Sequence, residues 1–208
     1  MKKRIAIELS IIVTLTPIFL YFAPRGIGLY SGTALLFLSY IVLTAKRTRQ
    51  IWGVPTEPKA VRWRRAVLTM SILTLPIVAA FLVWGYWRGH ELSWASLLLA
   101  LSIYVPWALL QQTIFQFYLL GRLRLLLPVP PVVVATLNGV GYGLVHLPDV
   151  PVSLLTIAGG IVWSNSYLRD RAIVPIALSH ALLGTTFYNA VVGRDLFHEL
   201  AGRLTQLF

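Results

Sequence analysis

Residues 66–87 read AVLTMSILTLPIVAAFLVWGYW and contain no charged side chain. The hydrocarbon core of a bilayer is about 30 Å thick and takes roughly 20 apolar residues of α-helix to cross. A run of this length and composition predicts a transmembrane helix. Arg62, Arg64 and Arg65 stand directly before it, as is typical of the cytoplasmic end of a membrane span.

Six further apolar segments surround this one, which predicts an all-α, polytopic membrane bundle of about seven transmembrane helices in a single domain, 1–208. The expected spans are 5–23, 29–45, 66–87, 94–120, 132–147, 152–168 and 173–192. The first resembles a signal peptide at its basic start, but its length favours a retained helix. The tail 193–208 has amphipathic spacing and either lies on the membrane surface or docks as a cap.

The composition supports a membrane protein and excludes other classes. Hydrophobic residues make up 57% of the 208-residue chain and charged residues only 12%, whereas about 25% is usual in soluble domains. This excludes a soluble enzyme, and it excludes a disordered chain because disorder requires low hydrophobicity. The absence of Cys excludes disulfides and thiolate chemistry.

The net charge of +11 follows the predicted loops rather than a nucleic-acid-binding domain. With a cytoplasmic N-terminus, fourteen Lys and Arg residues fall inside and four outside. This asymmetry predicts a multi-pass protein of the cell membrane with the N-terminus in and the C-terminus out. We expect the lipid bilayer as its environment and no nucleic-acid partner.

Polar side chains inside the spans concentrate in the second half of the chain, at helical four-residue steps. Such stripes tend to face the bundle interior, so they predict a small polar pocket between spans 94–120, 132–147 and 173–192. Gly139 and Gly143 would let their helix approach a neighbour closely. The pocket candidates are Gln111, Gln112, Gln116, Asn138, Tyr142, His146, Asn165, His180, Gly184 and Tyr188.

These residues leave alternatives open. The glutamines could only cross-link helices by hydrogen bonds. His146 and His180 could do the same, bind a metal or shuttle protons. We expect Glu8 to snorkel or to pair with Lys or Arg, and Asp149 to be a turn residue. No HExxH or GxSxG motif is present, and no cofactor is expected.

Residues 105–192 resemble the CPBP family of intramembrane glutamic proteases, which includes the CAAX-processing endopeptidases. The family pattern is Glu-Glu-x-x-x-Arg, then Phe-x-x-x-His often followed by Leu-Pro, then His-x-x-x-Asn. The matching stretches here are QQTIFQ at 111–116, YGLVHLP at 142–148 and HALLG at 180–184. The residues between these stretches, including IVPIALSH at 173–180, are also similar to those of the family.

The resemblance implies a catalytic site that this chain has neutralised. Gln111 and Gln112 stand where the family has its glutamates, Gln116 at its Arg and Gly184 at its Asn; only His146 and His180 match. An amide has no basic site with which to activate water, and loss of a general base typically removes about 10²–10⁴ in rate. A buried Arg without carboxylate partners would be an uncompensated charge. Replacement of the Arg by Gln116 is therefore consistent with replacement of the glutamates by Gln111 and Gln112.

Three functions are consistent with this sequence. The first is a degenerate, non-catalytic member acting as a membrane scaffold or regulator, which binds a membrane-protein partner or a peptide or isoprenoid-bearing segment. The second is an active intramembrane endopeptidase that uses His146 and His180 with an atypical base such as Glu8 or Asp149. The third is a small transporter.

Overall fold

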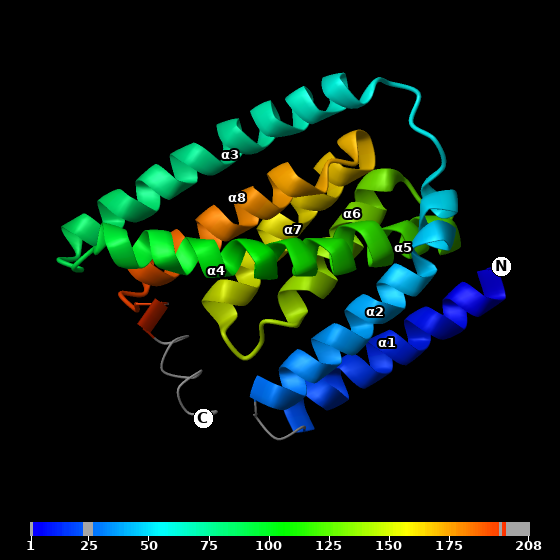
Figure 1. Cartoon of the computed structure of the whole chain (residues 1–208), viewed down its shortest axis with the longest axis horizontal. Helices are drawn as coiled ribbons and strands as arrows, with labels where there is room; N and C mark the ends of the chain where they lie inside the picture. Colours follow the sequence, from blue (N-terminus) through cyan, green and yellow to red (C-terminus); the bar gives the residue numbers. More distant parts are fainter. Residues whose placement is uncertain (1, 23–26, 196, 199–208) are drawn as a thin grey trace. The chain divides into compact units, whose positions relative to one another are not determined.

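The computed structural model describes residues 2–22, 27–195 and 197–198, and the side chains of all of these except 13, 15–22 and 27–35. Every regular element among them is a helix, which confirms the all-α prediction (Figure 1). The elements are α1 (Lys2–Phe22), α2 (Ile27–Trp52), α3 (Lys59–Trp87), α4 (Trp94–Gln112), η1 (Thr113–Leu119), α5 (Leu120–Leu126), α6 (Pro131–Leu144), α7 (Val150–Asp170), α8 (Ile173–Thr186) and η2 (Phe187–Val191).

Each predicted span coincides with helix over most of its length, and two of them contain an unexpected change of pitch. The fourth runs without a break through α4, η1 and α5, and the seventh through α8 and η2. Both η segments are π-helices, a form that often marks functional sites. The sequence pattern did not predict them.

Two helical stretches of the described chain are long and apolar enough to cross a membrane: Lys59–Trp87 and Trp94–Leu126. The helix Pro131–Leu144 is apolar but shorter. These stretches are consistent with a membrane helical bundle, while the count of seven spans and their orientation remain predictions. The predicted tail falls largely outside the described residues.

The chain forms two compact units, each built from two separated segments. The first comprises Met1–Pro58 and Gln112–Arg171, and the second Lys59–Gln111 and Ala172–Phe208. The first unit therefore contains α1, α2, η1, α5, α6 and α7, and the second contains α3, α8, η2 and nearly all of α4.

In the first unit, α6 and α7 form a tightly packed hairpin around glycines. A Cβ added to Gly139 would lie 2.5 Å from the backbone nitrogen of Ile161, and one added to Gly143 would lie 2.6 Å from the carbonyl oxygen of Ser153. The predicted close approach through these glycines is therefore confirmed, with α7 as the neighbour. Asp149 begins α7 by accepting a 3.2 Å hydrogen bond from the Val152 backbone N–H, which confirms its predicted turn role.

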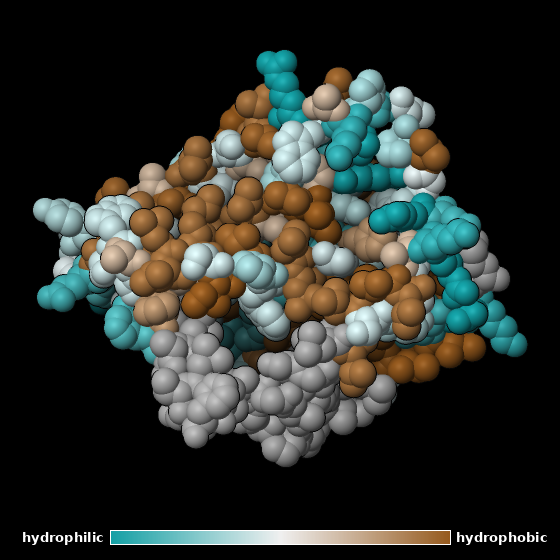
Figure 2. Space-filling model, in the orientation of Figure 1, coloured by the Kyte–Doolittle hydropathy of each residue, from teal (hydrophilic) through white to brown (hydrophobic). Residues whose placement is uncertain are grey.

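In the second unit, α3 packs along α8 and η2. The Thr74 and Ser179 hydroxyls, 2.6 Å apart, link α3 to α8 by a buried hydrogen bond. Many large apolar side chains of α3 and α4 are exposed; they include Leu68, Ile72, Leu75, Val83, Leu98 and Leu99. Figure 2 shows hydrophobic residues over much of the visible face. Apolar surface outside and polar contacts inside are what a lipid environment favours.

Candidate functional site

Gln116 lies at the centre of a buried polar cluster in the first unit. Its Oε1 accepts hydrogen bonds from Asn138 Nδ2 of α6 at 3.3 Å and from Ser164 Oγ of α7 at 3.0 Å. Asn138 Nδ2 also donates to Ser164 Oγ at 2.9 Å. All three side chains are buried, and Gln116 Nε2 has no hydrogen-bond partner. Three helical segments therefore meet at one neutral network.

Gln112 lies one turn earlier and contacts α6 separately. Its Nε2 donates to the Tyr142 hydroxyl at 3.4 Å, while its buried Oε1 has no hydrogen-bond partner. The Phe115 ring stacks on Tyr142 with centroids 4.1 Å apart. Each of the two glutamines thus leaves one buried side-chain atom, Gln112 Oε1 and Gln116 Nε2, without a hydrogen-bond partner. This costs free energy and leaves an acceptor and a donor able to bind a ligand.

His146 lies in the turn after α6 and is half-buried. Its Nδ1–H donates to the Tyr142 carbonyl oxygen at 2.9 Å. With Nδ1 protonated by this bond, the neutral imidazole presents a lone pair on Nε2. The ring could therefore act as a base or a ligand through that nitrogen.

The second unit holds His180 on α8, which is buried. The Tyr104 ring of α4 meets it edge-on, with centroids 5.6 Å apart. A Cβ on Gly184 would lie 2.9 Å from Tyr104 Cε1 and 3.0 Å from its hydroxyl oxygen. Tyr104 thus fills the space beside His180 that a longer side chain at 184 would need.

The structure brings together only part of the predicted pocket. Gln112, Gln116, Asn138, Tyr142 and His146 belong to the first unit, and Gln111, His180, Gly184 and Tyr188 to the second. A common pocket for both sets remains a prediction.

Within α7 the polar contact comes from Ser164, which the sequence analysis did not select. Asn165 is exposed, and its Nδ2 donates to the carbonyl of Ile161 in its own helix. The signal that could have identified Ser164 is Gly160, four residues earlier on the same helical stripe, which lies against Gly139 of α6.

Among the described residues, no three His, Asp or Glu side chains gather in a way that could hold a metal ion. Metal binding by His146 and His180 stays a prediction.

Comparison with known families identifies the part of the chain that carries these residues. Residues 92–186 match the family model described as type II CAAX prenyl endopeptidase Rce1-like. Over this stretch, called here the Rce1-like segment, the chain is similar to that family. The resemblance to the CPBP family is thereby confirmed over the stretch from α4 to α8. No curated protein and no solved structure matches the chain significantly.

The Rce1-like segment includes all three motif stretches, from Gln111 to Gly184. Tyr188 follows the segment, and Glu8 precedes it. The carboxylate closest in the sequence to the motif residues, Asp149, is occupied as the cap of α7.

A second polar cluster in the first unit connects α1 and α2 to the end of the α4–α5 helix. Arg122 is fully buried, and its Nε donates to Glu8 Oε2 at 3.1 Å. Its Nη1 donates to Thr48 Oγ1 at 3.1 Å, and its guanidinium carbon lies 3.4 Å from the centre of the Tyr118 ring. Glu8 also pairs with Arg4 and Arg47. The predicted pairing of Glu8 with Arg is therefore confirmed, although Arg122 was expected in a loop.

Proposed function

We propose that this protein is a non-catalytic member of the CAAX-processing family, acting as a membrane scaffold or regulator. In this proposal it binds a membrane-embedded peptide or isoprenoid-bearing segment without cleaving it. The Rce1-like match supports the ancestry. The loss of catalysis rests on the chemistry of Gln111, Gln112 and Gln116, which stand at the Glu-Glu-x-x-x-Arg positions of the family.

The observation that carries the proposal is the neutral network around Gln116. Its amide oxygen accepts hydrogen bonds from both Asn138 and Ser164. Gln116, which stands at the family's Arg position, therefore links helices instead of carrying a charge. At 112 an amide donates to a phenol. Neither group can take a proton from water near neutral pH.

The carboxylates that could replace the missing base are engaged elsewhere in the described first unit. Glu8 is ion-paired with Arg4, Arg47 and Arg122. Asp149 caps α7, and Asp170 pairs with Arg169 at 2.9 Å. Recruiting any of them would break an existing contact.

The second candidate is an endopeptidase in which histidines act with water. The contact that favours it is the bond from His146 Nδ1 to the Tyr142 carbonyl, because it directs the lone pair of a neutral ring to Nε2. For the third function, a small transporter, we find no comparable contact among the described residues.

A cleavage and binding assay separates these candidates. We expect the purified protein in detergent to bind a farnesylated CAAX peptide and leave it intact. Cleavage that is lost in both His146→Ala and His180→Ala would establish the endopeptidase instead. Absence of peptide binding by a folded protein would reject the scaffold proposal in this form.

The same proposal includes a seven-span topology in the cell membrane with the N-terminus in the cytoplasm. Trp63 stands near the basic start of α3, while Trp84, Tyr86 and Trp87 stand exposed near its end. Trp63 and Trp84 are 21 positions apart, so at about 1.5 Å per residue the helix separates them by roughly 32 Å. Aromatic residues at both ends of a bilayer-length helix are typical of the two membrane interfaces.

A further inference from the structure

Three arginines surround the single carboxylate of Glu8, so positive charge exceeds negative charge in this cluster. Arg122 Nε lies 3.1 Å from Glu8 Oε2, while Arg4 Nε and Arg47 Nη1 lie 3.4 and 3.9 Å from Oε1. Three guanidinium groups thus share one negative charge. Excess positive charge in a partly buried setting attracts an anion.

Two guanidinium nitrogens in this cluster are buried without a hydrogen-bond partner. They are Arg122 Nη2, on a side chain with 0% exposure, and Arg47 Nη1. Arg47 and Arg4 nevertheless remain accessible, with 40% and 67% of their side chains exposed. The cluster therefore combines a fully buried donor without a partner, Arg122 Nη2, with two partly exposed arginines. Guanidinium groups match the oxygens of phosphate especially well.

Apolar side chains next to the arginines indicate that the anion carries an acyl chain. Leu43 precedes Arg47 by one helical turn on α2 and is 83% exposed. On α1, Ile7 and Ile11 follow Arg4 by one and two turns and are more than half exposed. A free phosphate ion would leave these apolar side chains exposed, whereas the acyl chain of a lipid would cover them.

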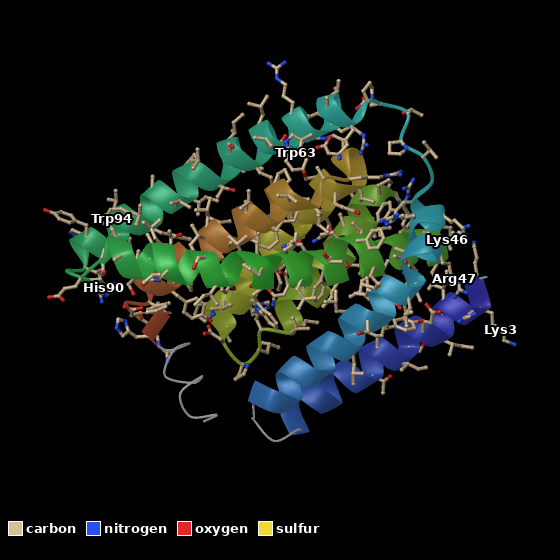
Figure 3. The ribbon with its side chains drawn as sticks, in the orientation of Figure 1. Lys3, Lys46, Arg47, Trp63, His90 and Trp94 are labelled. Atoms are coloured by element: carbon tan, nitrogen blue, oxygen red, sulfur yellow. The ribbon has the colours of Figure 1, made fainter. Side chains whose placement is uncertain are left out.

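The cluster also lies at the end of the helix pair where further basic residues gather. Figure 3 shows Lys3 near the start of α1 and Lys46 and Arg47 near the end of α2, at one end of this pair. Basic pockets and clusters at the cytoplasmic ends of membrane helices commonly bind anionic head groups.

We propose that Arg4, Arg47 and Arg122 form a binding site for the phosphate of an anionic phospholipid. Its acyl chain runs along Leu43 of α2 and Ile7 of α1. The site belongs to the first unit and is independent of whether the Rce1-like segment is catalytic.

Thermal unfolding of the delipidated full chain in detergent tests the proposal. We expect phosphatidylglycerol to raise the unfolding temperature, and phosphatidylcholine with the same acyl chains and inorganic phosphate to have little effect. Equal stabilisation by phosphatidylcholine would overturn the preference for an anionic lipid. Equal stabilisation by inorganic phosphate would overturn the lipid assignment.

A matched pair of variants locates the site. Arg47→Gln should weaken the apparent affinity for phosphatidylglycerol about tenfold, as loss of one charge-assisted hydrogen bond predicts. Lys46→Gln removes the same charge from the adjacent exposed residue and should retain most of the affinity. Equal losses in both variants would show diffuse attraction and reject the site. If Arg47→Gln does not fold, Arg4→Gln gives the same comparison.

Discussion

At the scale of single residues, α7 offers a matched comparison between two buried serines, Ser164 and Ser166, of which only Ser164 forms side-chain hydrogen bonds to other helices. Ser164 bonds to both Gln116 and Asn138, whereas the buried Ser166 hydroxyl has no hydrogen-bond partner. We expect Ser164→Ala to lower the free energy of unfolding by about 1–3 kcal/mol, because it removes two buried hydrogen bonds. Ser166→Ala should cause no loss. Denaturant unfolding in detergent measures both, and equal losses would refute the network.

Gly184 and Tyr104 provide a second residue-scale prediction, because they compete for one space beside His180. Gly184→Asn restores the residue type of the family motif but brings its side chain against the Tyr104 ring. We expect a loss of about 1–3 kcal/mol, as for other overpacked sites. Tyr104→Ala combined with Gly184→Asn should recover part of that loss. A double-mutant cycle of unfolding free energies measures the coupling, and strict additivity would show that the two residues do not compete.

At the scale of helices, the α6–α7 hairpin depends on where each glycine lies around α6. A Cβ on Gly139 would meet the α7 backbone, while a Cβ on Gly141 would meet no atom within 4 Å. Gly139→Ala should therefore destabilise the protein by at least about 1–3 kcal/mol through forced separation of the helices. Gly141→Ala should be neutral, or stabilising by up to about 1 kcal/mol, because Ala favours helix. Thermal unfolding distinguishes them, and similar effects of both changes would contradict this packing.

The start of α4 and the segment after η2 are joined by a pH-sensitive contact. Ser96 Oγ donates to Asp195 Oδ2 at 2.5 Å, and His198 Nδ1–H donates to the same oxygen at 2.7 Å. Burial raises the pKa of Asp195, but these hydrogen bonds outweigh it and lower the pKa to about 2, below the ordinary value of 3.8.

Because this pKa is depressed in the folded protein, the contact contributes stability above about pH 4 and loses it as the pH falls toward 2. Ser96→Ala should shift the Asp195 pKa upward and reduce this pH dependence. Carboxyl NMR of labelled aspartate measures the pKa directly. An unchanged value in Ser96→Ala would show that Ser96 is not a cause of the depression.

At the scale of the whole molecule, the sequence predicted the helices well because long apolar runs are a strong signal for helices of this length. Helices lie at each of the seven predicted segments, while the number that crosses a membrane stays a prediction, and glycine spacing indicated the close packing of α6. The sequence did not predict that Arg122 is buried. An arginine just after an apolar run is usually a loop residue, and its partners Glu8 and Thr48 come from distant parts of the chain. The sequence also missed Tyr104, because the space it fills exists only through the missing side chain of Gly184. Such contacts join residues from distant segments, and periodicity carries no information about them.

Topology is the prediction that the chain is best suited to test, because it contains no Cys and every introduced thiol is unique. Thr56→Cys precedes α3 and Glu91→Cys follows it, and both positions are exposed. If the basic end of α3 faces the cytoplasm, a membrane-impermeant maleimide should label Glu91→Cys in intact cells and Thr56→Cys only after permeabilisation. Ile72→Cys, midway along α3 and 68% exposed, serves as a control that lipid should shield from the reagent. Labelling of both loop positions from outside would mean that α3 does not span the membrane, and the reverse pattern would invert the orientation that the loop charges predict.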